Sequence, residues 1–187
     1  DVMDLGHLAR IPSNEFLGAG LWQLFKGIES PHKSVLKLLL IEVYASEHPH
    51  VNCLSLDFKR AVHANPLNLD ELDPDVGVYP RIERYLIGVG DLQRLERVRR
   101  SLYLQVNRKL TGPTVHVGRQ WQRQLLERLT VEWGWDQCTR AALDNRSHWD
   151  AEQVSHERLA VARELSVSYR FLRQFALGEK VRTTALG

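Results

Sequence analysis

The sequence predicts a mainly α-helical fold, an irregular bundle of five to seven helices. Apolar residues recur at steps of three and four in at least four separate segments, which is the spacing of one face of an α-helix. Strand signals are thin, since only the opening VMDL suggests the tail of a strand. The chain has 187 residues, of which 43% are hydrophobic and 26% are charged, so it is long enough for one domain with a packed core.

The stretch from residue 1 to residue 48 predicts a helical hairpin. Ser13 is expected to cap a first helix over residues 14–26, because a serine oxygen accepts a hydrogen bond from the free N–H groups of the first turn. Ser30 is expected to cap the second helix in the same way. Pro31 then stands at the first helical position, where its missing N–H costs nothing.

Residues 49–80 are the least regular part and predict a divergent, loop-rich or partly disordered segment, in which only residues 54–64 suggest a short helix.

Residues 81–187 predict the main helical bundle. Asp91 and Asp150 are expected to cap two of its helices, the second through a capping box with the glutamine three residues later. The helices expected here cover 92–110, 117–133, 136–143 and 151–179. The inner face expected for the last helix is Val154, Leu159, Ala162, Leu165, Tyr169, Leu172 and Phe175. The tryptophans expected to be structural are Trp121, Trp133, Trp135 and Trp149.

Composition and charge argue against several classes of function. The net charge of +2 is too small to argue for nucleic-acid binding. The longest strictly apolar run, 38–41, is far short of a membrane span, and no signal peptide is visible, so the protein is expected in the cytoplasm. Cys53 and Cys138 are interpreted as free thiols, and the HPH at 48–50 has no third metal ligand nearby. No GxxxxGK[ST] or GxGxxG glycine motif occurs.

Three lysines surround the start of the second helix and are candidate phosphate ligands. Lys33 and Lys37 are four residues apart, so their Cβ atoms lie ~5–6 Å apart on one helix face. Lys33 also stands in the first turn, where free N–H groups and the helix dipole favour an anion. Lys26 lies just upstream. The alternative is that these lysines form an ordinary solvated face. Trp22 is open between stacking on a base and packing in the core.

A second basic stretch, Arg94 to Arg100, suggests either phosphate binding or pairing with Glu83 and Glu96 on the surface. Together with the acidic residues at 70–75 it also leaves open an autonomous helical module that binds a protein partner or a regulator without catalysis.

Four stretches of the sequence resemble the bacterial class I adenylate cyclases. They are GAGLWQLFKGIESPHKSVLKLLLIEVYASEHP at 18–49, DLQRLERVRRSLYLQV at 91–106, EWGWDQCTRAALDNRSHWDAEQV at 132–154 and SYRFLRQFA at 168–176. They are long and rich in tryptophan, and they occur in the family's order. The weakest zone of the match is 51–80.

The resemblance implies the helical portion that follows a nucleotidyltransferase-type catalytic core, in an enzyme that makes 3′,5′-cyclic AMP and pyrophosphate from ATP. It implies two Mg²⁺ ions on the triphosphate, held by a Gly-Ser turn and an Asp-x-Asp pair expected upstream of Asp1 and not found in this chain. The chain, which opens without a Met, is therefore expected to be a piece of a longer protein and inactive alone. The partners implied are ATP and the upstream catalytic domain, with a regulatory protein left open.

The resemblance also favours the phosphate interpretation of the helical hairpin, because a second helical domain closes one side of the nucleotide cleft in nucleotidyltransferases. No catalytic residue and no metal ligand is expected in this chain. The substrate-binding residues expected are Lys33, Lys37, Lys26, Ser30 and Trp22.

Overall fold

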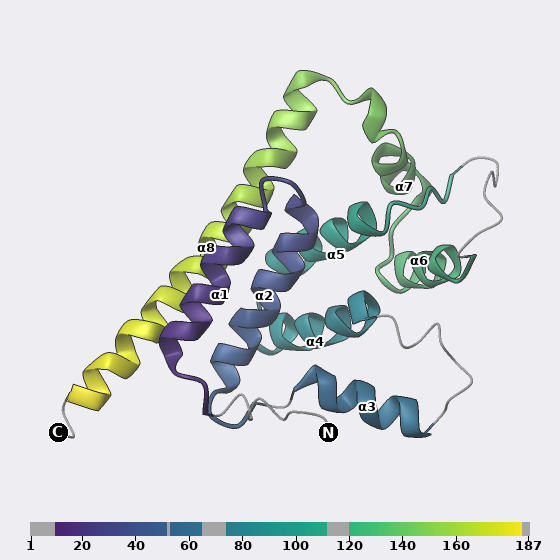
Figure 1. Cartoon of the computed structure of the whole chain (residues 1–187). Coiled ribbons are helices and arrows are strands. Elements are labelled where there is room, and N and C mark those ends of the chain that lie inside the picture. The colour runs from purple at the N-terminus through teal and green to yellow at the C-terminus, as the bar shows by residue number, and fades with distance from the viewer. Residues whose placement is uncertain (1–9, 52, 65–73, 112–119, 185–187) are drawn as a thin grey trace.

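The computed structural model describes residues 10–51, 53–64, 74–111 and 120–184 (Figure 1). In these ranges the chain forms α-helices, one short 3-10 helix and no strand, which confirms the mainly α prediction. The elements are α1 Ser13–Lys26, α2 Pro31–Glu47, α3 Leu54–Ala64, α4 Pro74–Gly88, α5 Leu92–Val106, α6 Gln120–Glu132, α7 Gln137–Asp144, η3 Arg146–His148 and α8 Ala151–Thr184. The eight α-helices of the described ranges exceed the predicted five to seven because α4 was not expected.

The hairpin of α1 and α2 lies lengthwise against the long α8 (Figure 1). Phe16, Leu38 and Leu172, one from each helix, are buried together between them. Gly20 makes this close approach possible, since a Cβ at that position would lie 2.7 Å from Cδ1 of Leu172. The hairpin is therefore packed into the bundle along its length.

A second core lies on the other side of α2, where α4 and α5 pack (Figure 1). Apolar side chains from α2, α4, α5 and α6 meet there, and they are fully or almost fully buried. The buried members of this cluster are Leu36, Leu39, Val43, Tyr79, Ile82, Leu86, Leu95, Val98, Leu102 and Leu129. Because α2 contributes to both cores, this helix is held from both sides.

Helix α4 corrects the prediction that 49–80 is loop-rich, because the first seven residues of this helix lie in that range. An internal Pro80 costs the helix a backbone hydrogen bond, which is why the sequence argued against a helix. The buried Tyr79, Ile82 and Leu86 offset that cost by filling the core beside α2. Helix α3 agrees with the short helix expected at 54–64, and residues 65–73 lie outside the described ranges.

Most helix ends fall close to the predicted positions. Asp91 caps α5 by accepting from the Arg94 N–H at 3.0 Å, as expected. Asp150 and Gln153 exchange two hydrogen bonds, of 2.8 and 3.0 Å, which confirms the capping box of α8. Helix α5 ends at Val106 rather than at 110, because Asn107 adopts a left-handed conformation with φ of 53°.

The inner face predicted for α8 is partly wrong. Leu159 is 56% exposed, and Ala162 is also exposed. The residues buried on this helix are Glu157, Val161, Glu164, Ser168, Leu172 and Ala176. Apolar periodicity cannot detect this face because three of its six positions are polar or charged.

Three of the tryptophans expected to be structural anchor the α5–α7 region. Trp133 makes an edge contact with Tyr79, at 5.4 Å between ring centroids, and another with Trp135 at 4.9 Å. Trp135 Nε1 donates to Glu96 at 2.8 Å, and Trp149 Nε1 donates to the Ala142 carbonyl at 3.0 Å.

Replacing Trp133 with Ala is expected to lower the free energy of unfolding by about 2–3 kcal/mol. This is less than the ~3–5 kcal/mol of a fully buried tryptophan, because the side chain keeps part of its surface in solvent. Urea unfolding followed by circular dichroism measures the change. A Trp133→Phe variant should lose less, and an Ala variant as stable as the parent would show that the ring contacts contribute nothing.

Candidate functional site

The turn between α1 and α2 leads into a first turn of α2 that is partly buried, with Ser30 exposed before it and Ser34 buried at its end. The Ser30 N–H donates to the Lys26 carbonyl at 3.0 Å, and the Ser34 N–H donates to the Ser30 carbonyl at 2.9 Å. Pro31 occupies the first helical position, as predicted. Ser30 stands at the N-cap, but its side chain makes no capping hydrogen bond, so that part of the prediction is wrong. The first turn also contains no acidic residue, so its partial positive charge is not offset there.

The three candidate lysines flank this turn in different environments. Lys37 is exposed, and Lys33, one turn closer to the start of α2, is half-buried. Lys26 ends α1 and forms an exposed ion pair of 3.5 Å with Glu29. Such an exposed pair is worth little and is easily exchanged for another anion.

Trp22 is exposed rather than part of the core. Its side chain is 56% exposed, it stacks on Phe25 at 5.6 Å between ring centroids, and Lys26 Nζ lies 5.5 Å from its ring centre. An exposed aromatic ring beside an ammonium group is suited to stacking on a flat ligand. Leu21 and Phe25 of α1, and Ile28 in the turn after it, are also exposed.

His32, in the first turn of α2, connects this helix start to the rest of the bundle. Burial lowers the pKa of its imidazole; Glu157 opposes the shift, while Arg146 and Arg100 add to it. Its Nδ1 is buried and has no hydrogen-bond partner among the described residues. Sequence reasoning missed these two arginines as neighbours of the α2 start, because they come from η3 and α5.

The arginines of 94–100 pair with carboxylates inside the domain. Arg99 contacts Glu83 at 3.1 Å and Glu96 at 3.6 Å, as the pairing alternative predicted. The others bridge helices instead. Arg94 reaches Glu42 of α2 and Glu164 of α8, Arg97 also reaches Glu164, and Arg100 reaches Glu157 at 2.6 Å. These contacts tie the arginines to the packing of α2, α5 and α8.

Two kinds of feature are absent from the described ranges. They contain no group of three or more His, Cys, Asp or Glu side chains placed to hold a metal ion. None of the helices described is long and apolar enough to cross a membrane. Cys53 and Cys138 are free thiols, as expected.

The fold and these surfaces define, within the described ranges, an all-helical domain with lysines around the start of its second helix. A family model described as "Adenylate cyclase, class-I, second domain" matches residues 11–186. The adenylate cyclases of Escherichia coli strain K12 and Yersinia intermedia are each 39% identical to the chain over 183 residues, and that of Proteus mirabilis is 36% identical over 184. No solved structure matches.

The chain belongs to the class-I adenylate cyclase family. Each of these matches covers 98% of this chain but only 21% of the relative, so the chain spans about a fifth of the length of the curated relatives it matches.

Proposed function

We propose that this domain works in an adenylate cyclase that converts ATP to 3′,5′-cyclic AMP and pyrophosphate in the cytoplasm, and that its α1–α2 hairpin contacts the triphosphate. Support for the activity comes from the family match over 11–186 and from the relatives, which are adenylate cyclases. A protein partner of regulatory function is compatible with this role.

The proposed role of the hairpin rests on how α2 begins. Ser30 makes no side-chain capping bond, Pro31 occupies the first helical position, and the first turn contains no acidic residue. Backbone N–H groups at such a helix end favour an anion, and Lys33 adds a full positive charge in the same turn. Lys26 and Lys37 extend the charge on either side, and the exposed Trp22 offers a face for the adenine ring.

The described residues do not fit a two-metal site, because no cluster of metal-ligating side chains occurs among them. We place the Mg²⁺ ligands of the proposed reaction in the nucleotidyltransferase-like part of the enzyme, within the four-fifths of the relatives' length that this chain does not match. What this chain supplies is binding and orientation of the nucleotide. No chemical step is assigned to its residues.

The purified 187-residue chain is expected to form no cyclic AMP from Mg-ATP, while a full-length cyclase carrying the same domain forms it. The reason is that the carboxylates that hold the metals are proposed to lie elsewhere. The assay is product detection by chromatography with equal molar amounts of both proteins. Metal-dependent cyclic AMP formation by the chain alone would contradict the proposal and direct attention to Asp70, Asp73 and Asp75.

A second candidate function is that of a helical protein-interaction module without a role in nucleotide binding. The observation in its favour is the exposed apolar surface of α1 and the turn after it, where Leu21, Trp22, Phe25 and Ile28 are each at least half exposed. Substitution of Trp22 by Ala separates the two functions. A higher KM for ATP supports nucleotide contact, whereas unchanged kinetics with altered assembly favours the interaction module.

A further inference from the structure

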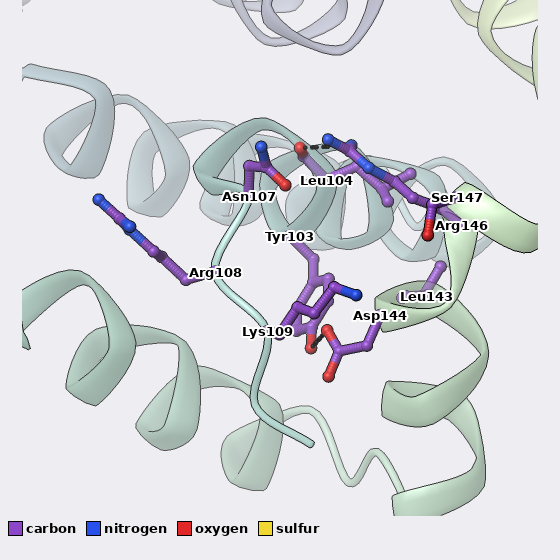
Figure 2. Close-up of a pocket in the computed structure, with 9 residues that line it drawn as sticks. All are labelled: Tyr103, Leu104, Asn107, Arg108, Lys109, Leu143, Asp144, Arg146 and Ser147. Atoms are coloured by element: carbon purple, nitrogen blue, oxygen red, sulfur yellow. Dashed lines mark hydrogen bonds between the residues drawn. The ribbon is translucent and has the colours of Figure 1, made fainter. Parts of the chain in front are cut away.

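A cavity of about 300 Å³ lies at the end of α5, against α7 and η3 (Figure 2). It is separate from the α1–α2 hairpin, since no residue of α1 or α2 lines it. The residues that line it are Tyr103, Leu104, Asn107, Arg108, Lys109, Leu143, Asp144, Arg146 and Ser147. The volume falls at the lower end of the range for small-molecule pockets, about 300–1,000 Å³.

The only carboxylate in this lining is already saturated. Asp144 is 5% exposed, and its Oδ1 accepts from the Tyr103 hydroxyl at 2.7 Å. Its Oδ2 accepts from the N–H groups of Leu110 and Thr111, at 2.9 and 2.7 Å, and from the Thr111 hydroxyl at 2.6 Å. Asp144 therefore fixes the wall of the cavity. Its two oxygens already accept four hydrogen bonds, so they do not pair with the basic side chains of the cavity.

Three cations share the lining, and none of them forms an ion pair in the described structure. Arg146 Nη1 donates to the Leu104 carbonyl at 3.0 Å. This bond uses one of the five N–H groups of the guanidinium and leaves the others for a ligand. Lys109 is exposed, and no contact of its ammonium group is recorded. Arg108 donates to Gln122 at 3.1 Å, and Figure 2 shows its side chain extending away from the other labelled residues. Lys109 and Arg146 are thus the cations available to a ligand.

The backbone that carries Lys109 is held in place. Asn107 turns the chain in a left-handed conformation directly after α5, and Asp144 clamps the N–H groups at 110 and 111. Arg123 donates to the carbonyls of Lys109 and Leu110, both at 3.2 Å. These bonds fix the backbone from which the exposed Lys109 side chain extends, so binding has to order that side chain but not the backbone.

We propose that this cavity binds a small phosphate monoester. The phosphate group would lie between Lys109 and Arg146, where an arginine fork suits two of its oxygens and a lysine adds a point charge. The Ser147 hydroxyl and the Asn107 amide are further donors in the lining. The organic part would contact the apolar wall of Leu104, Leu143 and Tyr103.

Calorimetric titration of the 187-residue chain with AMP tests the assignment, with adenosine and succinate as comparison ligands. We expect saturable binding of AMP, no comparable binding of neutral adenosine, and weaker binding of the dicarboxylate succinate. The Lys109→Gln variant should weaken AMP binding by roughly tenfold or more, the loss typical of a charged hydrogen bond. Because Lys109 is exposed, this change leaves the fold intact, which a thermal melt verifies.

Two matched variants complete the design. Arg163→Gln removes an exposed cation of α8 outside the cavity and should bind AMP as the parent does. Lys33→Gln alters the hairpin and reports whether AMP binds there instead. Loss of AMP binding in Lys33→Gln with full binding in Lys109→Gln would assign the phosphate to the hairpin and overturn the cavity proposal. Absence of AMP binding at millimolar concentration, or equal binding of adenosine or succinate, would overturn it as well.

Discussion

Replacing Arg94 with Met is expected to lower the free energy of unfolding by about 3–5 kcal/mol, because the change leaves buried carboxylates without their partner. Arg94 is 6% exposed and Glu42 and Glu164 are 1% and 3% exposed. At about 2–4 °C for each kcal/mol in a chain of this size, the melting temperature should fall by roughly 6–20 °C.

The geometry explains why this one side chain matters so much. Its Nη1 and Nη2 donate to the two oxygens of Glu42 at 2.8 and 2.9 Å, and its Nε donates to Glu164 at 3.0 Å. A further bond of 2.9 Å reaches Ser168. Burial alone would lower the pKa of Arg94, but the bonds to Glu42 and Glu164 outweigh it and raise the pKa, so the guanidinium stays charged. The network joins α2, α5 and α8.

The measurement is a thermal melt of Arg94→Met beside Arg128→Met. Arg128 pairs with Glu132 at 4.0 Å on the exposed face of α6, so its loss should change stability by no more than about 0.5 kcal/mol. The double variant Arg94→Met with Glu42→Leu should lose less unfolding free energy than the two single variants added together, because it also removes an unpaired carboxylate. Equal melting points for the two Arg→Met variants would show that the buried network contributes no stability.

This network also marks what the sequence could and could not predict about the fold. Helix starts were predictable where a short polar side chain has one local partner, as at Asp91 and Asp150. The buried face of α8 was not, because Glu157 and Glu164 are buried only through arginines of α5, more than fifty residues away. Hydrophobic periodicity assigns such positions to solvent. Helix α4 was missed because Pro80 is a local signal against a helix, and tertiary packing overrides it.

The candidate site shows the same division. The start of α2 and the lysines around it follow from the local pattern of Ser30, Pro31 and the spacing of the lysines. The neighbours of His32 come from α5, η3 and α8, and the phosphate cavity combines the end of α5 with α7 and η3. The segments that meet at each place are separated by more than thirty positions in the chain, so only the fold brings them together.

In a full-length cyclase carrying this domain, Lys33→Ala is expected to lower kcat/KM for ATP by roughly ten- to hundred-fold. A charged hydrogen bond to phosphate contributes about 1.5–3 kcal/mol, and each ~1.4 kcal/mol corresponds to one decade in rate. The uncapped start of α2 adds N–H groups at the same place but cannot replace a full charge. Lys33→Arg should restore only part of the loss, because a planar fork does not reproduce the position of a point charge.

Lys59→Ala, at an exposed position on α3, is the matched control and should keep parental kinetics. Lys59→Ala should melt near the parent, because its position is exposed. Lys33 is half-buried, so the melt of Lys33→Ala measures how much of its lost activity comes from folding. Parallel initial-rate measurements and thermal melts therefore separate substrate contact from scaffold damage. A large drop in melting temperature for Lys33→Ala would make its lost activity a folding effect. Normal kinetics in Lys33→Ala would assign the hairpin to packing against α8, and the lysines to an ordinary solvated face.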